Sequence, residues 1–177
     1  MLDSVFVSKN TILELVEISD AEFIYSLRMN ENLNRHISSV LAGVDNQIQW
    51  IKEYKKRERL SEEYYFIIKR KDTNIPIGTI RLYNITEDNR FCWGSWVLNE
   101  SKMKSSAIES AYLLYKFGFL YKGFISSYFQ VEKENKDVLA FHIKSGARVV
   151  REDNVNLHFE FSFEDFIKLE KKYHKYF

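Results

Sequence analysis

The segment from Val131 to Ala147 carries the side chains of this chain that are best suited to chemistry. Asn135 is followed seven residues later by His142 and after four more by Gly146. An imidazole exchanges protons near neutral pH, and a side-chain amide both donates and accepts hydrogen bonds. An apolar strand precedes the segment, and Gly146 stands where a left-handed residue ends a helix. The order predicted is therefore strand, asparagine, helix, glycine, strand.

A second segment has the chemistry of an anion site. It runs from Lys102 to Ala107 (KMKSSA), between an apolar strand and an amphipathic helix. Consecutive amides at a helix N-terminus, aided by the positive end of the helix dipole, bind phosphate groups. Serine is small and can donate a hydrogen bond, and two lysines add positive charge. A phosphate-bearing ligand is therefore expected here.

Both segments resemble motifs of the GCN5-related N-acetyltransferase (GNAT) superfamily. Asn135, Val138, His142, Gly146 and Ala147 fall on its N-x-x-A-x-x-x-Y-x-x-x-G-F segment, and residues 102–107 fall on its R/Q-x-x-G-x-G/A turn. The resemblance covers most of the chain and implies one domain over residues 1–177. The implied fold is mixed α/β (α+β), a mostly antiparallel sheet flanked by helices. The sheet is expected to splay between strands 91–98 and 125–131, and acetyl-CoA is the implied co-substrate.

The resemblance also implies roles for single residues. Asn135 would contact coenzyme A, and His142, at the family's tyrosine position, would protonate the leaving thiolate; a packing role for His142 stays open. Backbone amides near Trp96, Val97 and Leu98 would polarise the thioester carbonyl. The pyrophosphate would lie on Lys102, Met103, Lys104, Ser105, Ser106 and Ala107.

The sequence defines the residues that would bind the acceptor substrate less closely than those that would bind the cofactor. The first two helices and their connection wall the acceptor pocket in the family, so the candidates there are Arg28, Asn30, Arg35 and His36. Candidate bases are Glu14, Glu17, His36, Tyr83 and Glu100, or a water chain; Tyr83 and Glu100 are kept as catalytic candidates beside His142. Cys92 lies in an apolar strand, where a thiol behaves as a small hydrophobe.

Periodicity sets the elements. Strands are expected at 11–18, 64–70, 77–83, 90–98, 125–131, 149–153 and 155–161, with strand 90–98 buried on both sides. Gly94 indicates either a bulge or room for a neighbouring Trp. Capping-box spacing occurs at Ser19 to Glu22 and at Ser162 to Asp165.

Composition excludes several classes of protein. The 177 residues are 45% hydrophobic and 16% aromatic, which excludes disorder, and a net charge of +1 gives no global reason to expect nucleic acid. Cys92 is the only cysteine, and no metal-type spacing occurs, so no metal site is expected. The N-terminus has neither a signal nor a spanning pattern, so a cytoplasmic protein without membrane insertion is expected. A homodimer stays open.

Two classes of function fit these observations. One is an acetyl-CoA-dependent N-acetyltransferase acting on a primary amine of a polar small molecule. A nucleotide-linked amino sugar of surface polysaccharide biosynthesis is the favoured acceptor, with peptide N-termini and antibiotics as alternatives. The other is a non-catalytic acyl-CoA-binding module, which the missing glycines of the 102–107 turn favour.

Overall fold

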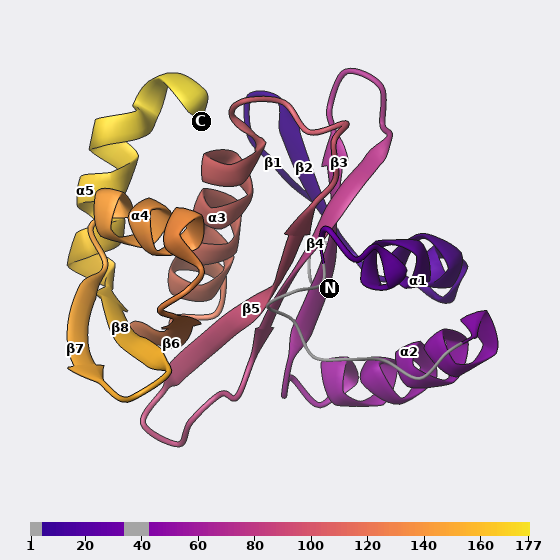
Figure 1. The fold of residues 1–177 in the computed structure, drawn as a ribbon, viewed down its shortest axis with the longest axis horizontal. Coiled ribbons are helices and arrows are strands. Elements are labelled where there is room, and N and C mark those ends of the chain that lie inside the picture. Colours follow the sequence, from indigo (N-terminus) through magenta and orange to yellow (C-terminus); the bar gives the residue numbers. More distant parts are fainter. Residues whose placement is uncertain (1–4, 34–42) are drawn as a thin grey trace.

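An eight-stranded sheet forms the centre of the structure, a computed structural model that describes residues 5–33 and 43–177. The strand order is β1-β2-β3-β4-β5-β6-β8-β7 (Figure 1). The strands are β1 (Val5–Val7), β2 (Thr11–Leu15), β3 (Tyr64–Arg70), β4 (Pro76–Tyr83), β5 (Arg90–Leu98), β6 (Ser126–Glu132), β7 (Arg148–Glu152) and β8 (Asn156–Ser162). Neighbouring strands are antiparallel except β5 and β6, which confirms the mixed, mostly antiparallel sheet.

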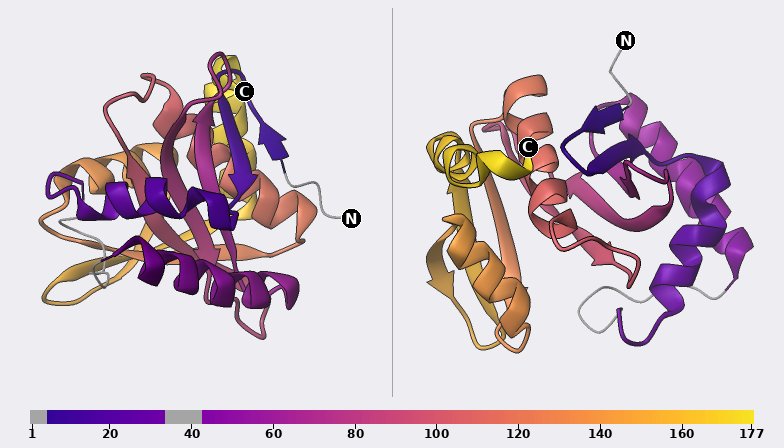
Figure 2. Two further views of the ribbon diagram at one scale, coloured as in Figure 1. Left: turned by 90° about the vertical axis from the view of Figure 1, so that its right-hand side faces the viewer. Right: turned by 90° about the horizontal axis from the view of Figure 1, so that it is seen from above.

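Helices cover both faces of the sheet (Figures 1 and 2). They are α1 (Ala21–Met29), α2 (Val44–Arg59), α3 (Ser106–Lys116), α4 (Lys136–Ser145) and α5 (Phe163–Tyr173). Alternate residues of β3 point into the two helical layers on either side of the sheet, because successive side chains along a strand point to opposite faces. Tyr65 and Ile67 pack with α1 and α2, whereas Tyr64 and Phe66 belong to the core under α3 and α5. We call these the α1 face and the α3 face.

The sheet opens between β5 and β6. Only Arg90↔Ser126 and Phe91↔Ser127 pair these strands, after which β5 and β6 diverge. The predicted splay is therefore confirmed. A bulge lies in β5 beyond the point of divergence, because Thr79 pairs with Val97 and Arg81 with Gly94, so that two residues of β5 oppose one of β4.

The bulge decides between the two interpretations of Gly94. Ser95, the next residue, has φ 47° and is one of the two bulged residues. A Cβ on Gly94 would lie 2.9 Å from the Tyr83 hydroxyl, so the glycine also makes room for a tyrosine rather than a tryptophan. The expectation that strand 90–98 is buried on both sides is wrong: Phe91, Trp93 and Val97 are buried, but the other residues of β5 are partly exposed.

Most of the predicted helix caps and strands are present in the structure, but the capping box before the first helix was placed wrongly. The Ser162 capping box with Asp165 is present, and Gly146 ends α4 with φ 101°. The first box forms between Glu17 and Asp20 around the 3₁₀ helix Ile18–Asp20, two residues before the predicted one. The strand β2 accordingly ends at Leu15 rather than at residue 18. The short strand β1 was not predicted. No helix among the described residues is long and apolar enough to cross a membrane.

Candidate active site

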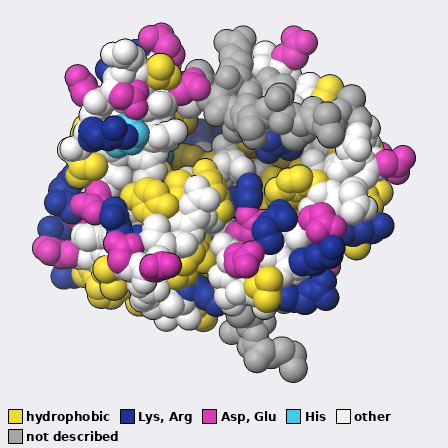
Figure 3. Space-filling model, turned by 90° about the horizontal axis from the view of Figure 1, so that it is seen from below, with side chains coloured by type: hydrophobic (Ala, Val, Ile, Leu, Met, Phe, Trp, Pro, Cys, Tyr) yellow, Lys and Arg dark blue, Asp and Glu magenta, His cyan; other side chains and the backbone are white. Residues whose placement is uncertain are grey.

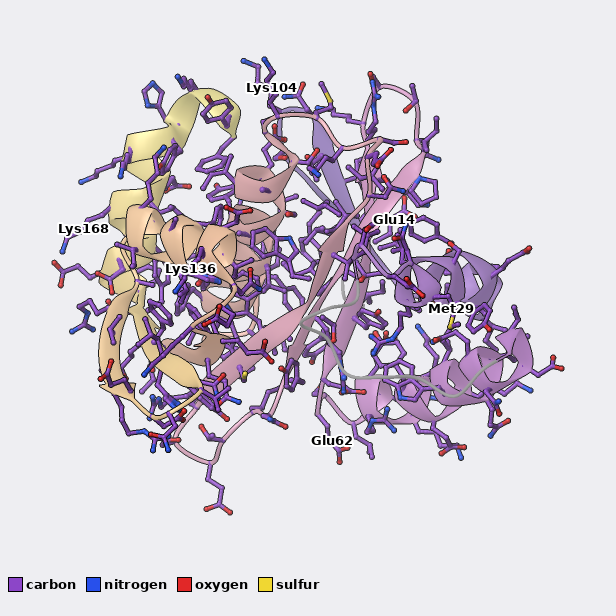
Figure 4. All side chains as sticks on the ribbon, in the orientation of Figure 1. Glu14, Met29, Glu62, Lys104, Lys136 and Lys168 are labelled. Atoms are coloured by element: carbon purple, nitrogen blue, oxygen red, sulfur yellow. The ribbon has the colours of Figure 1, made fainter. Side chains whose placement is uncertain are left out.

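The loop from Lys102 to Ala107, here called the phosphate loop, leads into the N-terminus of α3. The Met103 amide donates to Ser106 Oγ at 2.9 Å, and the Ser106 amide donates to Met103 O at 3.0 Å. Among the described residues, no acceptor is found for the amides of Lys104, Ser105 and Ala107. These amides stand at the positive end of the helix dipole, which is the arrangement that binds an anion. Figure 4 labels Lys104 at the top of the molecule, on this loop.

A buried carboxylate fixes the start of α3. Glu109 is fully buried, and its carboxylate accepts hydrogen bonds from Ser8 Oγ at 2.5 Å and from the Asn10 amide at 2.7 Å. Asn10 Nδ2 also donates to Glu109 Oε1 at 2.9 Å and to Ser105 Oγ at 3.3 Å. Burial raises the pKa of Glu109, but these hydrogen bonds outweigh it and lower the pKa. The turn between β1 and β2 therefore holds the phosphate loop in place.

Asn135 stands at the N-cap of α4. Its carbonyl accepts from the Leu139 amide at 3.0 Å, while its side chain makes no capping hydrogen bond. The side-chain amide is therefore unused by the helix it begins. Lys136 follows at the first position of α4 and is labelled in Figure 4.

The β5 bulge holds the three residues expected to polarise a carbonyl. Thr79 Oγ1 donates to Ser95 O at 2.9 Å and so fixes the bulge from the neighbouring strand. Trp96 Nε1 donates to Ser110 Oγ of α3 at 3.2 Å, and the Trp96 ring packs on Phe141 of α4. Val97 and Leu98 return to the ladder opposite Thr79 and Gly78. The bulged backbone thus lies beside the splay and between α3 and α4.

His142 lies on the α3 face, in an aromatic cluster. The side chain is 4% exposed, and its ring lies 4.3 Å from that of Phe129, 5.2 Å from Trp93 and 5.8 Å from Phe159. Burial lowers the pKa of His142 to about 3, because no nearby anion compensates the lost hydration of the imidazolium. The imidazole is therefore neutral at pH 7. The proton-donor role of His142 was predicted because an imidazole ordinarily titrates near pH 7, and the lowered pKa removes that reason. The role itself stays a prediction.

A pocket of about 570 Å³ opens on the other side of the same strands. Side chains of the α1 face from five strands, β4 to β8, contribute its polar and aromatic lining, namely Tyr83, Cys92, Tyr128, Gln130, Arg151 and His158. Trp93, Phe129 and Phe159, which contact His142 on the α3 face, also line it. Figure 3 shows the molecule from below, with a hollow in the upper middle bordered by hydrophobic, basic and polar side chains.

Tyr83 and Cys92 share one side of this pocket. They are paired residues on β4 and β5, and their side chains are hydrogen-bonded to each other. Burial raises the pKa of the Tyr83 phenol and of the Cys92 thiol, so both groups keep their protons at neutral pH. Tyr83 is therefore suited to donating a hydrogen bond and unsuited to accepting a proton.

The remaining candidates are dispersed. Glu100 is exposed in the turn after β5 and does not line the pocket. Glu14 pairs with Lys69, and Glu17 with Lys55 at 2.9 Å, so neither carboxylate is free. These ion pairs lie near the surface, where such pairs contribute little to stability.

The expected acceptor residues fall into three groups. Arg28 is half-buried beside Tyr65: burial raises the pKa of Tyr65, and the neighbouring Arg28 charge opposes that shift. Asn30 is exposed and accepts from the Asn32 amide at 3.0 Å. Arg35 and His36 lie outside the described residues.

Sequence reasoning missed most of the pocket. Tyr128 and Gln130 alternate along β6, and Arg151 and His158 pair across β7 and β8. The alternation that exposes one face of each strand was visible, but the register that brings these side chains together was not.

Comparison with known proteins supports the fold and the family. Residues 10–148 match the Acetyltransferase (GNAT) domain. The chain belongs to the GNAT superfamily. This GNAT chain is therefore an acyltransferase, and the suspected relationship is confirmed. None of the curated proteins compared with it matches.

Solved structures give the same result in more detail. Apo FdhC, described as a nucleotide-linked sugar GNAT, is 45% identical, with a TM-score of 0.91 and 97% of each chain covered. The ribosomal-protein-S5-alanine acetyltransferase of Vibrio fischeri has a TM-score of 0.81 at 15% identity, covering 93% of this chain and 99% of that one. A spermidine N-acetyltransferase of Vibrio cholerae, in complex with CoA and spermine, has a TM-score of 0.76 at 15% identity, covering 89% and 98%. The last two likenesses concern the fold alone.

Proposed function

We propose that this GNAT protein transfers an acetyl group from acetyl-CoA to a primary amine of a nucleotide-linked amino sugar. The observation that carries this proposal is the 45% identity to a nucleotide-linked sugar GNAT over 97% of both chains. Surface polysaccharide biosynthesis is the setting we propose for such an acceptor.

The proposed path of acetyl-CoA follows the splay. Its pyrophosphate would bind the phosphate loop, where the amides of Lys104, Ser105 and Ala107 have no acceptor among the described residues. Its acyl end would reach the β5 bulge, whose backbone amides can stabilise negative charge on a carbonyl oxygen. Asn135, with its side chain unused by α4, is a further proposed contact.

The proposed acceptor site is the pocket on the α1 face. Aromatic side chains such as Tyr83 and Tyr128 offer flat surfaces to a sugar ring, and Gln130 offers hydrogen bonds. Arg151 and Arg90 also line the pocket, and guanidinium groups suit the phosphates that a nucleotide-linked sugar carries. Arg28, Asn30, Arg35 and His36 remain proposed contacts, whereas Glu100, which does not line the pocket, is not placed to act as the base.

Acetyl transfer requires a neutral amine, a polarised carbonyl and a stabilised leaving thiolate. Two side chains that carry a proton at neutral pH border the splay, Tyr83 on the α1 face and His142 on the α3 face. We propose Tyr83 as the hydrogen-bond donor to the thiolate, with His142 as the alternative that the family motif suggests.

Thiol release from acetyl-CoA tests this function. Amino-sugar nucleotides, peptides and aminoglycosides are offered in parallel, and turnover is expected with the first class. Activity confined to peptides would reject the sugar acceptor. Because the phosphate loop lacks glycine, a thermal-shift titration with acetyl-CoA and CoA accompanies the screen. A stabilised protein that turns over no amine would identify a binding module.

A further inference from the structure

One row of side chains crosses the splay at the level of the bulge. Gly94 and Gln130 each lie three residues beyond the last β5 and β6 pair, Phe91↔Ser127, and the alternation along each strand places them on the same face on opposite sides of the splay. Gln130 pairs with His158 on β8, and His158 pairs with Arg151 on β7. Directly paired residues of antiparallel strands share a face. The imidazole of His158 therefore faces the pocket, whose β5 wall, Cys92 and Trp93, directly precedes the bulge.

The β7–β8 turn holds this imidazole. His158 Nε2 lies 2.6 Å from Asp153 Oδ2, and the other oxygen, Oδ1, accepts from the amides of Val155 at 2.8 Å and Asn156 at 2.7 Å. Hydrogen bonding from His158, with these two amides, holds the pKa of Asp153 well below its usual range. A carboxylate so fixed keeps the proton of a neutral imidazole on Nε2, which leaves Nδ1 as the basic nitrogen.

The surrounding charges are balanced. An Arg151 nitrogen lies 3.0 Å from Nε2 of His158 and donates to Nδ1 at 3.2 Å, so its charge opposes that of Asp153, and this exposed side chain must move away before Nδ1 takes up a proton. Arg151 is exposed, and His158 is the one hydrogen-bond partner found for its side chain among the described residues. Glu160, two residues along the same face, is paired with Arg90 at 3.0 Å and with Arg148 at 3.8 Å. Glu160 is thus ion-paired with Arg90 and Arg148 rather than with His158.

His158 is the one histidine among the described residues that line the pocket. No carboxylate lines it among the described residues, and Arg90 and Arg151 are permanently charged. Tyr83 and Cys92 keep their protons because burial raises their pKa values, and Tyr128 donates its hydroxyl proton to Asn84 O at 2.8 Å. His158 has a side chain 17% exposed and is thus reachable from the pocket.

We propose that His158, oriented by Asp153, is the catalytic base that takes the proton from the ammonium group of the acceptor. The proposal rests on the proposed function. The ammonium loses one proton to His158 Nδ1, and the neutral amine then forms the C–N bond to the acetyl carbon. The C–S bond breaks, the thiolate takes the second proton of the nitrogen or one relayed to it, and His158 releases its proton to solvent.

Steady-state kinetics with His158→Gln tests the step. We expect kcat at pH 7 to fall about 10²-fold or more, the usual scale for losing a general base, with little change in the KM of acetyl-CoA. The rate should recover as the pH rises above the pKa of the acceptor amine, because solution then supplies the neutral amine. Added imidazole should partly rescue His158→Ala. His174→Gln, the same change at an exposed histidine of the C-terminal 3₁₀ helix His174–Tyr176, should have no effect.

The two charged neighbours sharpen the test by acting in opposite directions. Asp153→Asn should move the acidic limb of the kcat/KM profile to lower pH, because the imidazolium loses its anion. Arg151→Ala should move that limb to higher pH, because a repelling cation is removed. A packing role for His158 would produce neither shift.

Each failure has its own signature. A folded His158→Gln protein with wild-type turnover and an unchanged pH profile overturns the base while leaving the acetyltransferase function standing. The role of His158 as the base is also overturned if the acidic limb of the kcat/KM profile stays at the wild-type pH in both Asp153→Asn and Arg151→Ala. Wild-type protein that releases no thiol with any amine overturns the proposed function and the base together. A thermal-shift titration with acetyl-CoA confirms that each variant is folded.

Discussion

The α3 face and the α1 face of the sheet differ most at the splay, although the same strands build both. On the α3 face, Trp93, Phe129 and Phe159 are buried with His142 in a closed aromatic cluster. On the α1 face, the intervening residues line an open pocket. Successive side chains of each strand point to opposite faces. A residue that packs in the core is therefore followed along the strand by one that can meet a substrate.

The two histidines make this difference concrete. His142 lies in the family's motif but is sealed among rings that lower its pKa to about 3. His158 lies in no motif, yet it has a carboxylate partner and reaches the pocket. Environment rather than residue type separates a buried packing imidazole from one that can meet a substrate.

The largest effect expected from this comparison is on turnover. Tyr83→Phe should lower kcat about 10²-fold, because it removes a donor near developing charge. His142→Phe should lower kcat less than about tenfold, since a neutral imidazole with a lowered pKa is a poor proton donor at pH 7. Single-turnover thiol release measures both variants. If His142→Phe lowers kcat as much as Tyr83→Phe does, His142 on the α3 face also serves as a donor to the thiolate.

The buried histidine should also make stability depend on pH. In the unfolded chain His142 takes up a proton below about pH 6.5, whereas in the folded protein it does so only near pH 3. The unfolded state therefore binds more protons as the pH falls through this window. The free energy of unfolding should drop by about 1.4 kcal/mol per pH unit, or about 2 kcal/mol at pH 5.

Urea unfolding of wild type and His142→Phe at pH 7 and pH 5 measures this contribution. The variant should lose about 2 kcal/mol less than wild type between the two pH values. His174→Gln serves as the control at an exposed position and should behave like wild type. Equal pH dependence in wild type and His142→Phe would mean that the imidazole is hydrated in the folded state.

The phosphate loop gives a smaller effect that is confined to the cofactor. Ser105→Asp would place a carboxylate against the bound pyrophosphate and should weaken acetyl-CoA binding at least about tenfold, or about 1.4 kcal/mol. Ser105→Ala, which removes the 3.3 Å contact from Asn10 Nδ2 and the hydrogen bond to Glu109 but adds no charge, should bind nearly as wild type. Calorimetry measures both affinities, and unchanged affinity in Ser105→Asp would place the pyrophosphate elsewhere.

The smallest effect concerns the glycine beside the bulge. A Cβ at Gly94 would meet the hydroxyl of Tyr83 at 2.9 Å, and a side-chain tip can move, so Gly94→Ala should cost less than about 1 kcal/mol of stability while lowering kcat severalfold. Gly78→Ala is the contrasting variant, because its Cβ would lie 2.0 Å from the carbonyl oxygen of Val97, which is backbone. Thermal unfolding should separate the two clearly, and a fully active Gly94→Ala would show that the Tyr83 hydroxyl need not stay in place.

The sequence by itself determined the local elements and the family. The aromatic and β-branched content of Tyr64–Arg70, the apolar run Arg90–Leu98, the Ser162 capping box and the left-handed Gly146 are short-range features, so each was recognisable from a few neighbouring residues. The spacing from Asn135 to Gly146 was enough to suggest the GNAT superfamily.

Only the tertiary structure decided which side chains meet. Tyr83, Gln130 and His158 are separated by tens of residues, and strand register together with the splay brings them around one pocket. Burial likewise changed the properties of His142 and of strand 90–98, because the lost hydration of a side chain depends on everything packed against it. Local periodicity encodes which way a side chain points, but the neighbours that it meets there are set by distant parts of the chain.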